Sequence, residues 1–461
     1  MDFLPFVAGY LAVITALAIY FSRRIKSSED FAVAGRSLGT LVVAGTLLAT
    51  WMGGGTLLGT AEFIYTYGPL AGALYCAIEP IGIALFFLIS RRIYLTKKIT
   101  ISEILYERYG SFASLISAIA IVMAYVGIAS YQIDGMGMII SYSSAINPES
   151  SYVIALIVMV VITISGGLLS VAYTDSISAI LITLTLLLGI PFALSAAGGF
   201  SGIASSLPPE NLTLGSTLSP VQWVGYFLPT ILLVLGDQNM YQRIFAAKDE
   251  RSARRGTLYW LLGCLIINVP IILLAVSSRA LALLPMERAD EAIIAIASST
   301  LPFAIGGIIL ATAAAFLLTT GDSYLLSSAT VTVYDIMARY SRREIRDKTK
   351  LSLQRLLVIV FALLSFVMVR FFPSALSIQM FAYTIYGATI TPALLGGLLW
   401  KGATKEGGIA SMIVGIFATL GAEWTVTRAI GINSVVVSAP LSFITLIIIS
   451  FLTKKKNSDA I

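Results

Sequence analysis

The stretch Thr50-Trp51-Met52-Gly53-Gly54-Gly55-Thr56 lies near the centre of an apolar run from residue 39 to residue 65. A glycine in a helix interior costs about 1 kcal/mol relative to alanine, so three consecutive glycines predict that a helix unwinds here. An unwound backbone at bilayer depth is tolerated only where protein or a polar cavity surrounds it. The stretch therefore predicts a broken transmembrane helix with exposed carbonyls; close helix packing through small residues is the alternative.

A second interruption, Gly236-Asp237-Gln238-Asn239, lies at the inner end of the apolar run 221–242. This run crosses in the opposite sense to the first. Two interrupted helices at matching positions of oppositely oriented halves are typical of inverted-repeat transporters. The expected parts are an extra helix and loop at 1–38, a first five-helix repeat at 39–200, a second at 201–405, and two helices with a short tail at 406–461.

The composition supports a membrane protein, because 57% of the 461 residues are hydrophobic and only 12% are charged, against about 25% charged in soluble domains. Apolar runs long enough to span a bilayer predict thirteen transmembrane helices, at 3–22, 39–65, 69–90, 112–142, 152–168, 170–196, 221–242, 257–283, 302–336, 352–371, 376–400, 407–427 and 434–452. We expect an all-α polytopic membrane protein. Little sequence remains for an ATPase, kinase or nucleic-acid-binding domain, and no phosphate-binding loop motif is present.

The basic residues predict the orientation. With thirteen spans, 26 of the 30 Lys and Arg residues fall on one side, leaving Arg279, Arg288, Arg370 and Arg428 on the other. The positive-inside rule then places the N-terminus outside and the C-terminus in the cytoplasm of a multi-pass cell-membrane protein. The first run has no basic segment before it, which indicates a retained span and not a cleaved signal peptide.

The sequence contains no histidine, so carboxylates, hydroxyls, amides and backbone carbonyls are the groups left for handling ions. Three acids within the spans, Glu62, Glu79 and Asp134, are functional candidates because burying a charge is costly. Glu79 precedes Pro80 and has a second reading as a partner for backbone groups freed at a kink. For Asp134 a gating role and helix-to-helix hydrogen bonding are equally open, and Tyr386 is a gate or a packing residue.

Several motifs resemble the sodium:solute symporter family, in the family's order. They are Asp30-Phe31-Ala32-Val33-Ala34-Gly35-Arg36-Ser37-Leu38-Gly39, Gly166-Gly167-Leu168-Leu169-Ser170-Val171-Ala172-Tyr173-Thr174-Asp175, Tyr241-Gln242-Arg243 with Ala246-Ala247-Lys248, and Thr319-Thr320-Gly321-Asp322-Ser323. The resemblance covers residues of roughly 30 to 410. It implies the five-plus-five inverted-repeat fold of neurotransmitter-transporter-like proteins and Na⁺-coupled uptake of a small solute.

The resemblance also implies a Na⁺ site. Family members supply two carbonyls from the first core helix and one carbonyl with two hydroxyls from the eighth. The matching residues are Ala49, Met52, Phe316, Thr319 and Thr320. Na⁺ is a hard cation that favours such oxygens; in the alternative, the two threonines only bond back to their own helix.

A second Na⁺ site is implied by Asp175, which matches an aspartate that some members use. Its eighth-helix partners would be Asp322 and Ser323. Asp322 departs from the family's hydroxyl-only pattern. Two nearby carboxylates at low dielectric repel unless a cation lies between them, so the group is a second Na⁺ site, a proton-sensitive gate, or part of a bridge to a cytoplasmic arginine.

The solute is expected beside the two breaks, and its candidate contacts are Trp51, Thr56, Asp237, Gln238 and Tyr383. Trp51 and the run Gly59-Thr60-Ala61-Glu62 resemble the choline-transporting branch, but Asp237 replaces that branch's second tryptophan. A tryptophan face plus a carboxylate suits an ammonium group. We therefore favour an amine- or amino-acid-like solute, with a monocarboxylate or a sugar as alternatives.

The expected function is secondary active transport by a single chain, with Na⁺ and a small solute as partners in a lipid bilayer. A transporter-like sensor and an ion channel are the alternatives of other classes. A channel would need a continuous polar pore. We expect no enzyme activity, since without histidine no pair of nucleophile and base emerges.

Overall fold

The apolar run that contains the three glycines forms two helices at an angle. In the computed structural model, α3 (Thr40–Trp51) ends just before Gly53, and a π-helical turn, Gly55–Thr60, leads into α4 (Ala61–Tyr67). The two halves are bent by 52°. The prediction of a broken helix at this place is confirmed.

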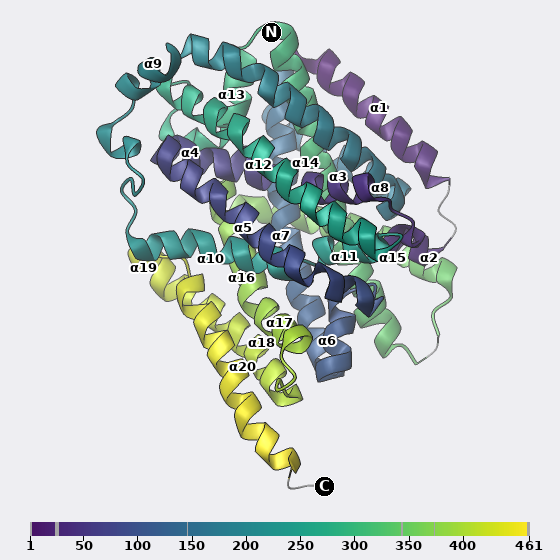
Figure 1. The fold of residues 1–461 in the computed structure, drawn as a ribbon. Helices are drawn as coiled ribbons and strands as arrows, with labels where there is room; N and C mark the ends of the chain where they lie inside the picture. The colour runs from purple at the N-terminus through teal and green to yellow at the C-terminus, as the bar shows by residue number, and fades with distance from the viewer. Residues whose placement is uncertain (1, 24–26, 145, 343, 373, 459–461) are drawn as a thin grey trace.

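The structure describes residues 2–23, 27–144, 146–342, 344–372 and 374–458, and within them it contains helices and no strand. The helices that build the bundle pack side by side (Figure 1). Those before the second break are α1 (Leu4–Ser22), α5 (Pro69–Thr96), α7 (Ser111–Ser143), α8 (Pro148–Ala196) and α10 (Pro220–Gly236). Those after it are α11 (Gln238–Ala246), α12 (Glu250–Ala280), α14 (Phe303–Val331), α15 (Asp347–Met368), α16 (Ala375–Thr389), α17 (Thr391–Leu399), α18 (Lys405–Ala422) and α20 (Val435–Ser458).

Short helices connect them on two sides of the bundle. One side, which we call the α9 side, holds α9 (Gly199–Ser206), α13 (Ala292–Ser299) and α19 (Arg428–Ile430); the other, the α6 side, holds α2 (Ser28–Val33) and α6 (Ile101–Tyr109) (Figure 1). On the α6 side, Arg36 donates to the Lys97 carbonyl (3.1 Å) and Arg108 to the Ala403 carbonyl (2.8 Å). Loops far apart in sequence therefore meet there.

The number of spans differs from the prediction. Eleven helices in the described chain are long and apolar enough to cross a membrane, or twelve when the bent pair α3–α4 counts as one span, instead of thirteen. The missing one is the run 221–242, which is divided into α10 with 17 residues and α11 with nine. The predicted separation of 152–168 from 170–196 is confirmed, because α8 is kinked at Gly167, whose φ of +50° favours glycine.

Although neither piece is long enough alone, α10 and α11 together pass through the bundle. Gly225 on α10 packs against Asn433 near α19. At the other end, the Lys248 amide beyond α11 donates to the Leu38 carbonyl (2.9 Å) at the start of α3. This pair is the second broken helix, with its break at Asp237.

Arg243 corrects one part of the charge count. The count assigns Arg243 to a connecting loop, but in the structure Arg243 lies on α11 with no solvent exposure. A guanidinium buried in this way must be paired within the protein. Three other members of the count, Arg24, Lys26 and Arg343, lie outside the described residues.

Candidate functional site

The break in the second span is held open by side chains from neighbouring helices. The Gly54 amide donates to Gln132 Oε1 on α7 (2.8 Å). A Cβ on Gly53 would lie 2.2 Å from Thr320 Oγ1, so only glycine lets α14 approach so closely. The unwound segment is therefore enclosed by protein, as its depth in the bundle requires.

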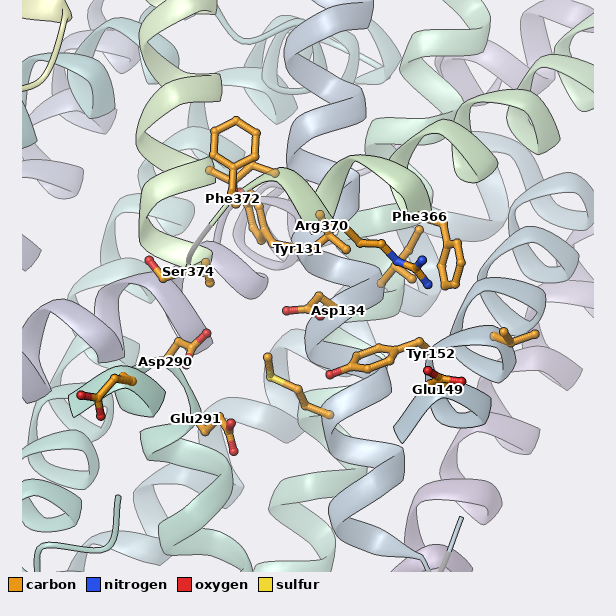
Figure 2. Close-up of a pocket in the computed structure, with 17 residues that line it drawn as sticks. Tyr131, Asp134, Glu149, Tyr152, Asp290, Glu291, Phe366, Arg370, Phe372 and Ser374 are labelled. Atoms are coloured by element: carbon orange, nitrogen blue, oxygen red, sulfur yellow. The ribbon is translucent and has the colours of Figure 1, made fainter. Parts of the chain in front are cut away.

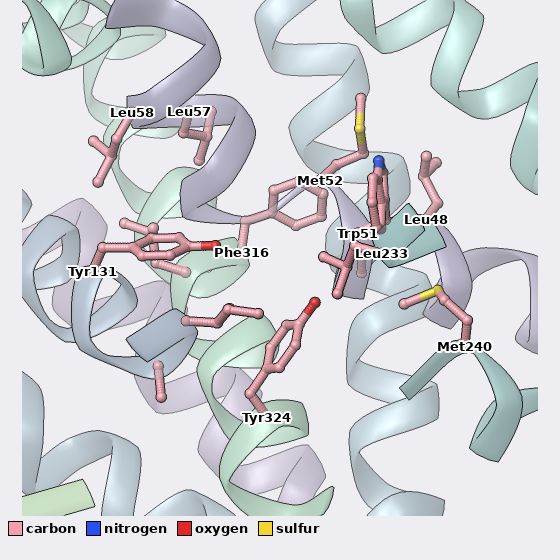
Figure 3. Close-up of a cluster of buried hydrophobic side chains, with 14 of the residues drawn as sticks. Leu48, Trp51, Met52, Leu57, Leu58, Tyr131, Leu233, Met240, Phe316 and Tyr324 are labelled. Atoms are coloured by element: carbon pink, nitrogen blue, oxygen red, sulfur yellow. The ribbon is translucent and has the colours of Figure 1, made fainter. Parts of the chain in front are cut away.

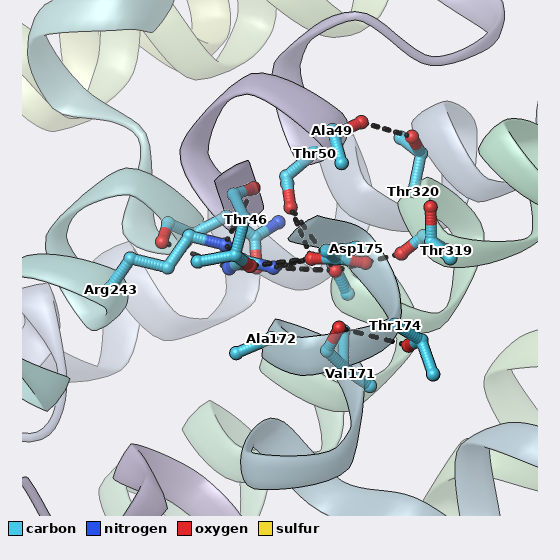
Figure 4. A network of polar contacts seen from close by, with 12 residues as sticks. Thr46, Ala49, Thr50, Val171, Ala172, Thr174, Asp175, Arg243, Thr319 and Thr320 are labelled. Atoms are coloured by element: carbon cyan, nitrogen blue, oxygen red, sulfur yellow. Dashed lines mark hydrogen bonds and ion pairs between the residues drawn. The ribbon is translucent and has the colours of Figure 1, made fainter. Parts of the chain in front are cut away.

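Four of the five residues predicted for the Na⁺ site meet at this break. Thr320 Oγ1 donates to the carbonyls of Ala49 and Phe316, at 2.9 Å each, and Thr319 Oγ1 donates to the Phe316 carbonyl at 3.2 Å (Figure 4). All four residues are buried. Ala49 lies in the last turn of α3, where carbonyls lack a partner in the helix. Neutral oxygens from two helices thus converge, and this donor set suits Na⁺.

Met52, the fifth predicted ligand, is completely buried at the end of α3. Its amide continues the helix to the Leu48 carbonyl (2.9 Å). Its sulfur accepts a hydrogen bond from Thr56 Oγ1 (3.5 Å), so Thr56 faces back toward the break. The Met52 carbonyl lies next to Gly53, the residue in contact with Thr320.

Asp175 is the centre of a second polar network, one turn away along the same helices. Its Oδ2 accepts from Thr46 (2.5 Å) and Thr50 (3.4 Å) on α3, and it forms an ion pair with Arg243 Nη2 at 3.4 Å (Figure 4). Both side chains of the ion pair have no exposure. Of the predicted roles of Asp175, the structure shows the bridge to an arginine.

Arg243 also determines where the other two predicted residues lie. Its Nη2 donates to Ser323 Oγ at 2.6 Å, so the guanidinium bonds both Asp175 and Ser323. Asp322 instead accepts from Thr163 on α8 (2.5 Å). Asp322 thus has a hydrogen-bond partner of its own, but its carboxylate and that of Asp175 still repel each other, so the grouping of the three side chains stays a prediction.

The break in the seventh span is organised around Asp237, which is fully buried and caps α11. Its Oδ1 accepts from Tyr125 (2.6 Å) and from the Asn239 amide (2.6 Å), and its Oδ2 accepts from Tyr324 (3.1 Å). A carboxylate at a helix N-terminus is stabilised by the free amides and the helix dipole. The structure thus gives this acid three donors from the protein.

Two predicted residues flank the same break. Tyr386 accepts from the Gln238 amide (2.9 Å) and donates to the Gly236 carbonyl (2.8 Å). Its ring stacks on Tyr125 at 5.5 Å. The Gln238 side chain accepts from the Ile101 amide (2.6 Å) and points to the α6 side, so the structure contradicts its prediction as a solute contact.

Trp51 lies among aromatic rings at the end of α3. Its ring centroid is 6.1 Å from Tyr383 on α16 and 6.1 Å from Trp260 on α12. Figure 3 shows Trp51, Met52, Phe316 and Tyr324 gathered around the break. The predicted contacts Trp51 and Tyr383 are therefore adjacent, and the centre of the bundle is lined by aromatic and apolar side chains.

A cavity of about 780 Å³ opens from the α9 side and reaches Tyr131 (Figure 2). It contains Asp134, the predicted gate, and four more acids against one arginine: Glu149, Glu287, Asp290, Glu291 and Arg370. Burial, with the neighbouring Glu291 charge, raises the pKa of Asp290 to about 6. The cavity is electronegative, which favours cations.

Four residues that bond the two breaks were not among the predicted site residues: Gln132, Tyr125, Tyr324 and Arg243. The signal for Gln132 was an amide inside a long apolar run, where a polar side chain must find a partner. The two tyrosines carried no such signal. Phenol groups are amphipathic and occur throughout cores.

These features define a class: a polytopic helical transporter with two broken helices, a buried oxygen site at one break and a cavity that opens to one side. The chain belongs to the sodium:solute symporter family, whose family model matches residues 31–415. It is a Na⁺-coupled solute symporter.

Relatives of known activity match most of the chain in sequence. The human high affinity choline transporter 1 is 26% identical over 422 residues, covering 85% of this chain and 70% of that protein. The sodium/proline symporter of Haemophilus influenzae is 23% identical and covers 100% and 95%. A solved structure of a Na⁺-coupled sialic acid symporter, substrate-bound and outward-open, superimposes with a TM-score of 0.85 over 98% of both chains at 19% identity. The inverted-repeat transporter fold is confirmed.

Proposed function

We propose that this chain takes up a small amine- or amino-acid-like solute together with one Na⁺. The observation that carries the proposal is the Thr320 hydroxyl, which lies 2.9 Å from both the Ala49 and the Phe316 carbonyl at the break of the second span. Na⁺ would be held there by Ala49, Met52, Phe316, Thr319 and Thr320. Bound Na⁺ would be coordinated by the freed carbonyls and would hold α3 against α14.

The position of Arg243 supports a stoichiometry of one Na⁺ per transport cycle. The second site, if present, would use Asp175 and Ser323, and the guanidinium bonds both of them. A tethered cation there makes a further Na⁺ unfavourable, because two positive charges would compete for one carboxylate. We infer that Asp175 stabilises the fold and does not bind Na⁺.

The charge of the α9-side cavity supports an amine over a sugar. Five acids and one arginine line it, and Arg288 pairs with Glu291, which leaves an excess of acids; relatives transport choline and proline. The charge count supports an orientation in the cell membrane with this side outside the cell and the C-terminus in the cytoplasm. Asp134 and Tyr386 would act as gates at the two ends of the path. All these groups belong to one chain, so a monomer suffices.

The Na⁺ site is tested on purified protein, without knowledge of the solute. The measured quantity is the Na⁺ concentration that gives half of the maximal rise in melting temperature, with K⁺ as the control ion. Thr319→Ala and Thr320→Ala each remove one ligand and should raise this concentration about 10- to 100-fold, as expected for a lost bond to a charged group. Thr312→Ala, on the same helix but bonded to Thr185, should not.

The same variants are then compared in proteoliposomes under an inward Na⁺ gradient. Radiolabelled choline, L-proline and pantothenate serve as probes, since relatives carry these solutes. Uptake of at least one of them, driven by Na⁺ and lost in Thr320→Ala, is the expected result. Unchanged Na⁺ dependence in both threonine variants would refute the assignment of the site.

A further inference from the structure

Glu79 is a buried carboxylate in the middle of α5, with 6% of its surface exposed. Its Oε2 accepts from Asn268 Nδ2 on α12 at 3.3 Å and lies 3.6 Å from Cys264 Sγ. No Lys or Arg of the described chain forms a salt bridge with it. A buried carboxylate with only neutral partners is costly.

The kink at Pro80 does not explain this carboxylate. Proline has no amide hydrogen, so Pro80 leaves the Cys76 carbonyl, one turn earlier, without its helical donor. Asn268 Nδ2 donates to that carbonyl at 3.2 Å. The kink is therefore satisfied by Asn268, and Glu79 is not needed for it.

Glu79 borders the break of the second span. The Trp51 indole lies beside its carboxylate, and the Trp51 ring is 6.1 Å from Tyr383. A buried carboxylate beside aromatic rings attracts an ammonium ion, through charge pairing and the cation–π interaction.

Several polar atoms around this place lack a partner. Asn268 Oδ1, Gln132 Nε2 and Gln379 Oε1 are buried and make no hydrogen bond in the described structure. The Gln379 amide faces Gly55 and Gly59, across the same break. Buried polar atoms in native proteins nearly always have a partner, so this cluster indicates a ligand with donors and acceptors of its own.

Asp237, the acid first expected to hold the solute, lies in a different environment. Tyr125, Tyr324 and the Asn239 amide already donate to it. Of the two carboxylates near the breaks, Asp237 caps its own helix, whereas Glu79 receives only side-chain donors, from Asn268, Cys264 and Trp51.

We propose that Glu79, with Asn268 Oδ1 and the aromatic rings beside it, binds the positively charged group of an ammonium-bearing solute. The assignment rests on the proposed function, because it names the solute class of the same transport site. Glu79 is the residue that determines this specificity.

The first experiment uses the wild-type protein in Na⁺ and needs no variant. Choline and L-proline are compared by thermal shift with isosteres in which carbon replaces the charged nitrogen, 3,3-dimethyl-1-butanol and cyclopentanecarboxylate, and with the anion pantothenate. We expect an ammonium-bearing probe to raise the melting temperature and its carbon isostere to fail at equal concentration. Stabilisation by a carbon isostere or by pantothenate alone, or none by either ammonium probe, would overturn the proposal.

The second experiment compares Glu79→Gln with Glu62→Gln. Glu62 is a partly buried carboxylate on α4 that accepts from the Leu376 amide (2.9 Å). Glu79→Gln should weaken binding of the ammonium probe at least about 30-fold, as for truncation of one partner of a buried charge pair. Glu62→Gln should not. Glu79→Asp, which keeps the charge, should retain more affinity than the amide.

Na⁺ separates this inference from the proposed function. If Na⁺ still raises the melting temperature of Glu79→Gln as it does that of the wild type, the variant is folded and its Na⁺ site is intact. Unchanged affinity for the ammonium probe in that folded variant refutes the role of Glu79 alone. A wild type that Na⁺ does not stabilise refutes the transport mechanism instead. Should Glu79→Gln fail to fold, Glu79→Asp and the wild-type comparison decide.

Discussion

The two broken helices use the same backbone device in different ways. At the first break, three glycines leave the segment open, and Gln132 Nε2 and Gln379 Oε1 have no partner among the described residues. At the second, Asp237 caps its own helix and Tyr125, Tyr324 and Tyr386 bond the remaining groups. A buried polar group without a partner costs about 1–3 kcal/mol. Under the proposed function the first break is completed by ligands, whereas the second is completed by the protein.

Arg243 joins the two broken helices on the α6 side. From α11 it donates to Thr46 Oγ1 on α3 (2.9 Å), to Ser323 on α14 (2.6 Å), and to Asp175 on α8. Four helices therefore depend on one guanidinium. The acidic cavity opens on the other side of the bundle.

The largest effect is expected from Arg243→Gln, which tests whether the two breaks share this anchor. The variant leaves Asp175 buried without a counter-charge and should lose about 3–5 kcal/mol of unfolding free energy. Thermal unfolding of the purified protein measures the loss. Because the cost comes from the unpaired charge, Arg243→Gln combined with Asp175→Asn should recover most of it; a single variant as stable as the wild type would show that the anchor is unimportant.

Gly53→Ala should break the first site by crowding. Its Cβ would lie 2.2 Å from Thr320 Oγ1, and overpacking of this kind costs about 1–3 kcal/mol. We expect the half-maximal Na⁺ concentration to rise at least about tenfold, since 1.4 kcal/mol is a factor of ten. Gly421→Ala on α18, with nothing within 4 Å, is the matched control. Equal Na⁺ responses in both would argue against close contact between α3 and α14.

Asp237→Asn sharpens the contrast between the breaks. If the second break is self-contained, the variant should lose about 1–3 kcal/mol of stability, because the new amide nitrogen cannot accept the hydrogen bond from Tyr324. The affinity for the solute should stay within about threefold of the wild type, well under the tenfold that 1.4 kcal/mol would give. Isothermal titration calorimetry measures the solute affinity, and thermal unfolding measures the stability. Weak solute binding at an unchanged melting temperature would return the ammonium role to Asp237.

The smallest effect concerns the acidic cavity that leads to the first break. The pKa of Asp290 is raised from 3.8 to about 6, mainly by burial. The folded protein therefore holds this proton more tightly than the unfolded chain, and the Asp290 contribution to stability falls as the pH rises from about 4 to 6. The cavity gains negative charge over the same rise.

Uptake of a cationic solute below saturation should accordingly increase about twofold between pH 5 and pH 7, an effect screened by salt. Asp290→Asn should flatten the profile without changing the maximal rate. A wild-type profile that Asp290→Asn reproduces would exclude this carboxylate as the cause.

Local composition was sufficient to predict most of the membrane-spanning helices and the first break. Runs of apolar residues predicted the helices, and Gly53 to Gly55 predicted the first break, because helix length and helix breaking depend on neighbours in sequence. The adjacent pair Thr319 and Thr320 and the family motifs were likewise readable, and the structure brings both threonines to the Ala49 and Phe316 carbonyls. The one helix miscounted, 221–242, is the one whose capping aspartate divides it.

The partners of the buried polar groups were decided only by tertiary structure. Nothing local to Arg243 distinguishes a loop residue from a buried anchor, and nothing near Glu79 shows that Asn268, 189 residues away, takes over the kink and leaves the carboxylate with an aromatic neighbour. Asp322 and Ser323 are adjacent in sequence, yet one faces Thr163 and the other Arg243. Which helix face meets which depends on long-range packing of the whole bundle, and that packing determines where a buried charge finds its partner.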